Sequence, residues 1–570
     1  MGTYGGGGRT YGAIATALAL ATLVGVATAG AREETVAPRG KAVGIDASAA
    51  APSSMNVTAV CLATPYPRAC ETALSPAAGR RSSGGDPFAA SVRFAMARAA
   101  SARALARNLS SSSSSARRRG VLSAASGMDD CAELLDITLG QLRDALAGDG
   151  PAADGVTTWL SAAMTNQATC GDSLAAVPAS AGREAVRARV AALAQFIGTA
   201  LALHANKLKA TPSSAAPAPS TSSPPAAGTT TTLPSWLSPH DRKLLESPAN
   251  ASGVTLDAVV AQDGSGTHRS IGEALAAVTA ANGGRRGGGG RKVIYVKAGR
   301  YEESLSISSQ QKNVMLMGDG KGRTVIVDHK SAADGYTTYA SATVAAMGSG
   351  FIAKGLTIVN SAGPGKGQAV ALRVGGDLSV VYRCAIQAHQ DTLYAHSNRQ
   401  FYAENDIVGT VDFIFGNSAV VIQNCNIQGR RPGPGQKDTV TAQGRTDPNQ
   451  NTGISIHRCR ITGAPDLGGT PVYLGRPWQK YSRTVVMETF LDRSIAPAGW
   501  LEWSGQFALS TLYYGEYGNI GPGAGTSKRV RWPGVHTSLS TSDATKFTVA
   551  NFILGNSWLG GTGVSYISGL

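Results

Sequence analysis

The feature that most constrains the fold of this 570-residue chain is a short repeat that ends in isoleucine. In the C-terminal half, five segments share this ending, at Ile358, Ile386, Ile407, Ile427 and Ile461. Ile386 and Ile407 are 21 residues apart. A short strand that recurs at about this period indicates a solenoid of stacked parallel strands, because each repeat must bury its apolar side against the next one. Successive rungs of such a stack lie roughly 4.8 Å apart.

Two aspartates occupy the same position in successive repeats. Asp391 and Asp412 are also 21 residues apart, and each follows its isoleucine by five residues. On neighbouring rungs, their carboxyl groups face each other at about 5 Å. Like charges at that distance do not both form readily, so one pKa is raised while the other stays low. The repeat therefore predicts a paired acid and nucleophile.

Composition and charge bound the possible partners. The chain is 43% hydrophobic and only 16% charged, and it is long enough for more than one domain with a sizeable core. Its net charge is +15, which favours a polyanion such as nucleic acid, an anionic membrane or an acidic polysaccharide. No nucleic-acid-binding motif accompanies the charge, and the basic residues are scattered, so no nucleic acid partner is expected.

The N-terminus predicts export from the cell. Arg9 precedes an apolar run over residues 13–29 that ends in Ala27-Thr28-Ala29, a small-x-small cleavage site. Residues 1–29 are therefore interpreted as a secretory signal peptide, with an uncleaved signal anchor as the alternative. No later stretch is expected to cross a membrane. The sequence thus predicts a secreted, extracellular glycoprotein, with glycosylation sequons at Asn56, Asn108 and Asn250.

The region 52–207 is rich in Ala, Leu and Ser, with apolar residues at helical spacing, which predicts an all-α helical bundle. The serine run 110–115 and the arginines that follow it are interpreted as a solvated loop. An even number of cysteines in a secreted helical domain predicts two disulfides, and sequence alone leaves three pairings open. The cysteines concerned are Cys61, Cys70, Cys131 and Cys170.

A linker is predicted over residues 208–245. Its stretch 211–234 consists almost entirely of Pro, Ser, Thr and Ala, which bury too little apolar surface to fold. It ends in Arg242-Lys243-Leu244-Leu245, where the basic pair is either a processing site or the start of a charged helix.

The residue pattern of the chain is different over residues 252–570. Short β-branched runs alternate with Gly, Asn and Asp, and the clearest helical signal is Ile271–Thr279. A β-sandwich shows strictly alternating apolar and polar residues, whereas these strands are continuously apolar. We therefore predict an all-β domain, a right-handed parallel β-helix.

Five motifs of this region occur in a fixed order. They are Gly299-Arg-Tyr301-Glu-Glu303, Gln368-Ala-Val-Ala-Leu372, Gln390-Asp391-Thr-Leu-Tyr394, Gly409-Thr-Val-Asp412-Phe-Ile-Phe415-Gly-Asn417 and Leu474-Gly-Arg476-Pro-Trp478. Together they closely resemble the plant pectin methylesterases, from about Val254 to Leu570. The helical region resembles the pectin methylesterase inhibitor family through the segment Thr158–Asn166 and the four cysteines. In precursors of this type, the dibasic-Leu-Leu sequence is a processing site.

The resemblance implies hydrolysis of the methyl esters of pectin homogalacturonan, for cell wall modification, through an acyl group on Asp412. Asp391 then protonates the departing methanol and later activates water. Arg476 orients the nucleophile through a bidentate contact. Gln368 and Gln390 donate amide N–H groups to the oxyanion. Neither a cofactor nor a metal is expected.

Four aromatic side chains of this region are candidates for binding sugar rings, because their flat faces suit a pyranose. Together with Arg476, they are Trp478, Trp503, Phe415 and Tyr394. Phe415 and Tyr394 suit a core position equally well. The catalytic candidates also have structural alternatives: a turn cap for each aspartate, a stacked amide ladder for the glutamines and a structural ion pair for the arginine.

Two residues depart from the family pattern. His389 stands where members commonly have Tyr, beside the candidate acid, and Asn405 stands where many have Cys. Cys425 and Cys459 occupy matching positions on rungs expected to be adjacent, within disulfide reach. Cys384 is expected two spacings from Cys425, at roughly 9–10 Å, and is therefore predicted to be a free thiol.

The leading hypothesis is a pectin methylesterase of the extracellular cell wall. Its N-terminal region is then an autoinhibitory pro-region or one that serves folding or retention. Expected partners are pectin, inhibitor proteins and a processing protease. A polygalacturonase or pectate lyase is the second hypothesis, which methanol release separates from the first. A non-catalytic pectin-binding protein is the third.

Overall fold

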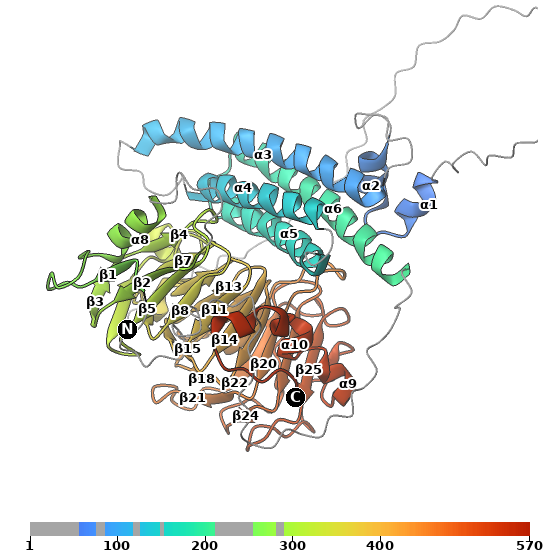
Figure 1. Ribbon diagram of the computed structural model, residues 1–570. Coiled ribbons are helices and arrows are strands. Elements are labelled where there is room, and N and C mark those ends of the chain that lie inside the picture. Colours follow the sequence, from blue (N-terminus) through green and yellow to red (C-terminus); the bar gives the residue numbers. More distant parts are fainter. Residues whose placement is uncertain (1–55, 76–85, 118–125, 149–152, 211–254, 281–289) are drawn as a thin grey trace, which may run out of the picture. The chain divides into compact units, whose positions relative to one another are not determined.

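The computed structural model describes residues 56–75, 86–117, 126–148, 153–210, 255–280 and 290–570 (Figure 1). Residues Ser54–Leu570 belong to one compact unit. The predicted signal segment 1–29, the linker from residue 211 and the basic pair at Arg242 lie outside the described residues.

The N-terminal part is helical, as predicted. Its helices are α1 (Val57–Leu62), α2 (Pro67–Leu74), α3 (Pro87–Arg117), α4 (Ser126–Ala147), α5 (Ala153–Ala175) and α6 (Ala181–Ala210). Alanines recur along the buried side of α3, at Ala95, Ala99, Ala102 and Ala106, each fully buried. Spacings of three and four residues place them on one face, and their small side chains let neighbouring helices approach closely.

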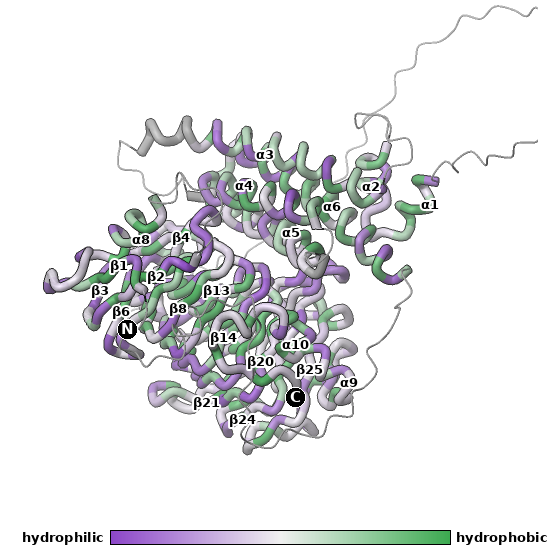
Figure 2. The backbone as a smooth tube through the Cα atoms, viewed as in Figure 1, coloured by the Kyte–Doolittle hydropathy of each residue, from purple (hydrophilic) through white to green (hydrophobic). Residues whose placement is uncertain are grey.

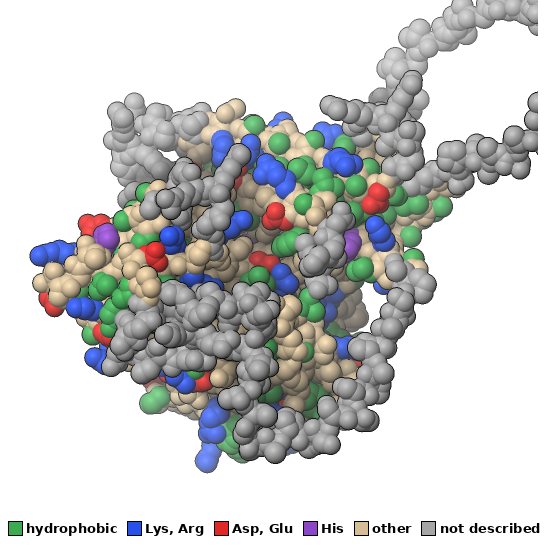
Figure 3. All heavy atoms as spheres, viewed as in Figure 1, with side chains coloured by type: hydrophobic (Ala, Val, Ile, Leu, Met, Phe, Trp, Pro, Cys, Tyr) green, Lys and Arg blue, Asp and Glu red, His purple; other side chains and the backbone are tan. Residues whose placement is uncertain are grey.

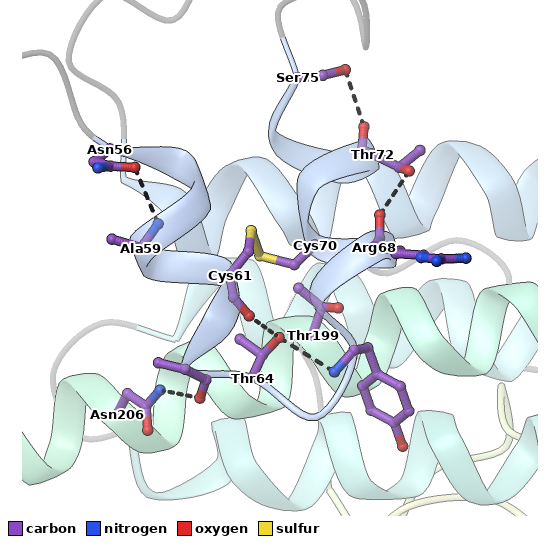
Figure 4. The surroundings of a disulfide bond; sticks show 12 residues. Asn56, Ala59, Cys61, Thr64, Arg68, Cys70, Thr72, Ser75, Thr199 and Asn206 are labelled. Carbon is purple, nitrogen blue, oxygen red and sulfur yellow. Dashed lines mark hydrogen bonds between the residues drawn. A yellow bond between two sulfur atoms is a disulfide. The ribbon is translucent and has the colours of Figure 1, made fainter.

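Two disulfides hold this helical part together. Cys61–Cys70 joins α1 to α2 (Figure 4), and Cys131–Cys170 joins α4 to α5. The structure thus confirms the predicted number and selects one of the three pairings.

One expectation for the helical region was wrong. The serine run 110–115 lies within α3, which continues to Arg117. Serine is only moderately less favourable than alanine in a helix, so a run that follows Ala-rich turns continues the helix. Among the described helices, α6 is long and apolar enough to cross a membrane by length and composition. Because 56% of its apolar window is buried within the protein, its burial matches that of a core helix of the bundle.

The C-terminal part is a parallel β-helix of three sheets, here named A, B and C (Figure 1). Sheet A contains β1 (Ala258–Val260), β2 (Lys292–Val296), β5 (Val314–Gly318), β8 (Ile352–Lys354), β11 (Ser379–Tyr382), β14 (Arg399–Ala403), β17 (Ala419–Gln423), β20 (Gly453–His457), β23 (Arg483–Met487), β25 (Tyr513–Tyr517) and β26 (Val535–His536). Sheet B contains β3 (Gly299–Glu302), β6 (Thr324–Asp328), β9 (Thr357–Asn360), β12 (Ala385–Gln387), β15 (Asp406–Gly409), β18 (Asn426–Gly429), β21 (Arg460–Gly463) and β24 (Phe490–Leu491). Sheet C contains β4 (Leu305–Ile307), β7 (Val344–Ala346), β10 (Leu372–Val374), β13 (Leu393–Ala395), β16 (Ile414–Gly416), β19 (Asp438–Gln443) and β22 (Val472–Pro477).

The isoleucine repeat forms a ladder in sheet B. Ile358, Ile386, Ile407, Ile427 and Ile461 are consecutive partners in register, and all are fully buried. Figure 2 shows hydrophobic residues along the stacked strands. The predicted repeat and the predicted fold are both confirmed.

A second ladder runs along the turn from sheet A to sheet B. Each turn passes through one residue of positive φ, at Arg383 (52°), Glu404 (54°), Asn424 (53°), Arg458 (53°) and Glu488 (46°). The residue that follows is buried and stacks on its counterpart in the next rung. The backbone N–H of Cys384 donates to Asn405 Oδ1 at 2.8 Å, and that of Asn405 donates to Cys425 Sγ at 3.3 Å. These bonds link the rungs inside the protein.

The disulfide predicted between Cys425 and Cys459 is absent, because both cysteines are free and buried. They do lie on adjacent rungs, but each sulfur accepts a hydrogen bond from the rung before it. The N–H of Cys425 donates to Cys459 Sγ at 3.4 Å, and the N–H of Asn405 donates to Cys425 Sγ. Cys384 is also free, as predicted.

Short helices cover parts of the β-helix. The helix α8 (Ile271–Ala280), expected from sequence, buries Ile271 and Leu275 in the core shared with the first strands. Near the C-terminus, α9 (Thr541–Thr545) and α10 (Val549–Phe552) pack against the outer face of sheet A through Ala544 and Val549.

Candidate active site

The site is built on the outer face of sheet C. Leu393 and Ile414 point into the core, so the next residues, Tyr394 and Phe415, point outward. Tyr394 pairs with Phe415, Phe415 with Ala442, and Ala442 with Arg476. This register aligns one outward column of side chains across four consecutive rungs.

Asp391 and Asp412 lie two residues before β13 and β16, beside this column. Both have positive φ, 64° and 51°, which aspartate adopts more readily than most residues. Because Leu393 pairs with Ile414, the two aspartates occupy equivalent positions on successive rungs. They are nearly buried, at 7% and 5% exposure. The predicted shared phase is confirmed.

The carboxylate of Asp412 is fixed by two neighbours. Arg476 donates from Nε to Oδ1 at 2.8 Å and from Nη2 to Oδ2 at 2.7 Å, which is the predicted bidentate ion pair. Thr439 donates its hydroxyl to Oδ1 at 2.7 Å and accepts the backbone N–H of Asp412 at 2.8 Å. Burial opposes the charge of Arg476, but the ion pair with Asp412 outweighs it and raises the Arg476 pKa.

Asp391 has a different environment. Burial is the larger cause, and the charge of Asp412 the second, of a pKa well above the ordinary value for aspartate; Arg476 opposes the shift. The expectation from the sequence attributed the raised pKa of one aspartate to the neighbouring charge alone. The two carboxyl groups thus differ in the way that separates a proton donor from a nucleophile.

Every predicted catalytic and sugar-binding residue lines one cavity of about 320 Å³. From the predicted set, the lining includes Gln368, Gln390, Asp391, Tyr394, Asp412, Phe415, Arg476, Trp478 and Trp503. The rings of Tyr394 and Phe415 stack with centroids 4.1 Å apart. The guanidinium carbon of Arg476 lies 4.4 Å from the centroid of the Trp503 ring. The cavity therefore joins the two carboxyl groups to a strip of aromatic faces.

Some of the lining was not foreseen from the sequence. The end of α5 contributes Thr169, Asp172 and Ser173 to the same cavity, and Ala176, directly after α5, also lines it. Burial raises the pKa of Asp172 to about 6. The β-helix adds Thr337, Thr338 and Tyr339. No local signal marks the helical residues, because they meet the site through tertiary packing only.

His389 is not among the residues that line the cavity, although it precedes the Gln390-Asp391 pair. Burial, and then the charge of Arg430, lower its pKa to about 4. In the described part of the chain, no group of three or more His, Cys, Asp or Glu side chains is arranged to hold a metal ion.

Comparison with known proteins gives consistent results for both the helical region and the β-helix. The family model described as "Pectinesterase" matches residues 257–556, and "Plant invertase/pectin methylesterase inhibitor" matches residues 55–203. "Probable pectinesterase/pectinesterase inhibitor 35" of Arabidopsis thaliana is 51% identical over 488 residues, 85% of this chain and 88% of that relative. "Pectinesterase 2" of Citrus sinensis is 45% identical over 526 residues, 91% of this chain and 96% of that relative. The solved structure "Pectin methylesterase from Carrot" is 52% identical with a TM-score of 0.54, and it covers 56% of this chain and 100% of its own.

Proposed function

The chain belongs to the pectinesterase family and hydrolyses methyl esters of pectin, and from that premise we propose that Asp412 is the nucleophile and Asp391 the proton donor. The observation that carries this assignment is the difference between two carboxyl groups on successive rungs. Asp412 is held by Arg476 in a bidentate ion pair, whereas burial and the neighbouring charge favour the neutral form of Asp391.

In the first half of the reaction, an oxygen of Asp412 attacks the carbonyl carbon of a methyl-esterified galacturonate. The negative charge that develops on the carbonyl oxygen is stabilised by amide N–H groups of Gln368 and Gln390, which line the same cavity. The carbon–oxygen bond to the methoxy group then breaks. Asp391 donates its proton to that oxygen, so methanol leaves and an acyl group remains on Asp412.

In the second half, Asp391 is ionised and acts as a base. It takes a proton from water, and the resulting hydroxide attacks the acyl carbon. The bond to Asp412 breaks, which releases the galacturonic acid unit and returns Asp412 to its ion pair with Arg476. The new carboxyl group of the product then loses its proton to solvent. Asp391 ends the cycle protonated, as it began.

Sugar binding is assigned to the aromatic strip of the cavity. The stacked rings of Tyr394 and Phe415, the edge-on Trp478 and the partly exposed Trp503 offer flat apolar faces beside the carboxyl pair. Arg476 connects the strip to the nucleophile, because it stacks on Trp503 while it binds Asp412. A pyranose ring on these faces positions its ester at the two aspartates.

The test is methanol release by Asp412→Ala. Loss of the nucleophile is expected to lower kcat by at least about 10³-fold, as for other residues that act as a catalytic unit. Asp406→Ala, on β15 and paired with Lys321 outside the cavity, is the matched control and keeps wild-type turnover. Substantial methanol release by well-folded Asp412→Ala removes the nucleophile assignment. If the wild-type segment that follows residue 245 releases no methanol, the esterase assignment is wrong. The remaining hypotheses are then another β-helix pectinase and a non-catalytic pectin binder.

The helical region is assigned an autoinhibitory role in the precursor. Along α5, Thr165 accepts a hydrogen bond from Asn417 at 2.9 Å. One helical turn later, the Thr169 hydroxyl lies 3.3 Å from Tyr394 Oη and 3.0 Å from His396 Nε2. The same face of α5 then continues into the cavity lining. A helix bonded to the sugar-binding face leaves no room there for a polymer.

This role is tested on the uncleaved chain. Thr169→Lys is expected to raise methanol release at least several-fold, because a long charged side chain does not fit the buried contact with Tyr394 and His396. Arg93→Ala, exposed on α3, serves as the control and leaves the activity unchanged. Equal activity of the uncleaved chain and of the chain cleaved after Leu245 contradicts autoinhibition and leaves a role in folding or retention.

Secretion to the cell wall completes the proposal. It rests on the apolar segment that ends at Ala29 and on the basic pair at Arg242, which suits a processing protease. The mature N-terminus is expected shortly after Leu245. N-terminal sequencing of protein extracted from cell wall material measures it, and a start near Gly30 contradicts processing.

A further inference from the structure

Arg373 stands in the same outward column as the active site. It is the central residue of β10, and its partner in the next rung is Tyr394. The column then continues through Phe415 and Ala442 to Arg476. Arg373 and Arg476 are thus four rungs apart, or about 19 Å along the β-helix. Two guanidinium groups therefore bracket the stacked aromatic pair.

Arg373 is a buried cation without an anion. It is 4% exposed, and it forms no ion pair with a carboxylate in the described part of the chain, so the charge of Asp130 acts on it only at longer range. Its Nη1 donates to Met347 Sδ at 3.2 Å, a weak acceptor, and its Nε has no hydrogen-bond partner in the described part of the chain. The guanidinium carbon lies 3.2 Å from the centroid of the Tyr339 ring, which fixes its plane. A charge buried in this way is costly unless a partner arrives.

The charge of Arg373 acts on the surface that the helical region covers. Together with burial, it lowers the pKa of His396 to about 3. It also opposes the burial that raises the pKa of Asp130, on α4, to about 6. Asp130 is hydrogen-bonded to Ser173 and Thr337, so it approaches this surface without closing an ion pair on Arg373. Removal of the helical region takes away Asp130, the neighbouring carboxyl group whose pKa responds to the charge of Arg373.

We propose that Arg373 binds the free carboxylate of a galacturonate unit in the pectin chain, several units away from the ester that is cleaved. A planar guanidinium fork matches a carboxylate with two parallel hydrogen bonds. The polymer lies along the column, with its sugar rings on Tyr394 and Phe415 between the two arginines. This inference rests on the proposed function, because it takes pectin as the substrate.

A specificity follows from the position of Arg373. Each ester that is hydrolysed creates a new carboxylate, so a partly de-esterified chain carries the group that Arg373 binds, and a fully esterified chain does not. Binding through Arg373 therefore favours esters that lie at a fixed distance from an existing carboxylate. Arg373 is a specificity residue in this assignment and takes no part in the chemical step.

The test uses the chain after Leu245, which corresponds to the complete carrot structure and has its own core. Arg373→Gln is compared with Arg383→Gln, an exposed arginine that pairs with Glu404 outside the cavity. The substrates are oligogalacturonates of equal length, either fully methyl-esterified or partly de-esterified. For Arg373→Gln we expect KM to rise about 10-fold or more on the partly de-esterified oligomers, with kcat unchanged. KM on the fully esterified oligomers stays within about twofold, and Arg383→Gln changes neither.

Inhibition by fully de-esterified oligogalacturonate gives a second readout, and its inhibition constant is expected to rise in parallel. Arg373→Lys restores part of the affinity, because an ammonium keeps the charge but loses the fork. Equal changes of KM on both substrates, or none, overturn the inference. Methanol release from the fully esterified oligomers by the wild-type chain supports the proposed function whichever result Arg373→Gln gives.

Discussion

At the scale of single residues, the site separates two identical side chains by their surroundings. Asp412 and Asp391 have the same backbone conformation and equivalent positions on successive rungs. Only Asp412 receives a bidentate arginine, and only Asp391 is buried without such a partner. The division of roles therefore depends on Arg476 more than on the aspartates themselves.

Replacement of Arg476 by lysine tests that dependence. An ammonium cannot reproduce the two parallel hydrogen bonds, and the loss of about 1.5–3 kcal/mol corresponds to roughly 10–100-fold in kcat/KM. Arg460→Lys, on the exposed side of sheet B, is the control and keeps wild-type rates. Steady-state methanol release measures both. Near-wild-type kinetics for Arg476→Lys show that the fork does not orient the nucleophile.

Asp438 is a buried carboxyl group that the reaction does not use. It is fully buried, and neither carboxyl oxygen has a hydrogen-bond partner in the described residues. Burial, and then the charge of Asp466, raise its pKa to about 9. Gly429 lies opposite, where an added Cβ would come within 2.5 Å of Asp438 Oδ2. The folded protein therefore keeps this group neutral at pH 7.

The pH dependence of stability follows from that shift. Because the folded pKa lies above the unfolded value, the contribution is fully present below about pH 4 and is lost as pH rises towards 9. The loss is about 1.4 kcal/mol per pH unit within this window. Asp438→Asn stays neutral, so its free energy of unfolding is expected to exceed that of the wild type increasingly from pH 4 to pH 8. Urea unfolding across this range measures it, with the exposed Asp263→Asn as the control. Parallel curves for Asp438→Asn and wild type contradict the raised pKa.

At the scale of elements, the repeat predicted more of the fold than any single motif. The isoleucine ladder set the register of sheet B, and through it the rungs of Asp391 and Asp412. The hydrogen bonds of Thr439 to Asp412 were not predicted, because a long segment separates β16 from β19. No constant spacing therefore links Thr439 to Asp412. The contribution of α5 was missed for a similar reason, since periodicity describes neighbours along one solenoid and not the packing of a separate helical region against it.

The cysteine prediction shows where spacing is insufficient. Adjacent rungs bring Cys425 and Cys459 within reach, but the turn of positive φ directs each sulfur at a backbone N–H of the preceding rung. We expect thiol labelling of the denatured, unreduced full-length chain to modify three cysteines, Cys384, Cys425 and Cys459. The four cysteines of the helical region stay protected by their disulfides. If only Cys384 is labelled, the three cysteines are not all free. Cys425 and Cys459 then form the disulfide that their spacing predicted.

At the scale of the whole molecule, the part of the chain that remains after the proposed processing keeps a net positive charge. The chain after Leu245 contains 30 Lys and Arg against 22 Asp and Glu, and it therefore keeps +8 of the total +15. Figure 3 shows Lys and Arg side chains spread over the face in view, with Asp and Glu among them. A distributed charge of this kind attracts a polyanion over a distance and does not define one binding stripe.

We therefore expect blockwise, salt-sensitive de-esterification. Each ester cleaved adds a carboxylate to the polymer, and the attraction that results keeps the enzyme near that stretch and delivers it to adjacent esters. Added salt screens this attraction, with a Debye length of about 10 Å at 0.1 M. Moderate salt should release the enzyme from wall material and shorten the blocks, whereas very low salt traps it on its product and slows turnover.

The measurement is the length of de-esterified blocks on highly esterified pectin across a salt series, with the chain after Leu245. Arg373→Gln in the same series separates the two sources of block formation. A specific contact at Arg373 shifts block length at every salt concentration, because a partly buried pair is screened much less than exposed charges. Long-range attraction instead fades as the Debye length falls below the distance between surface and polymer. If the block length of the wild type does not change with ionic strength, long-range attraction does not cause the blocks. The esterase assignment is unaffected by that result.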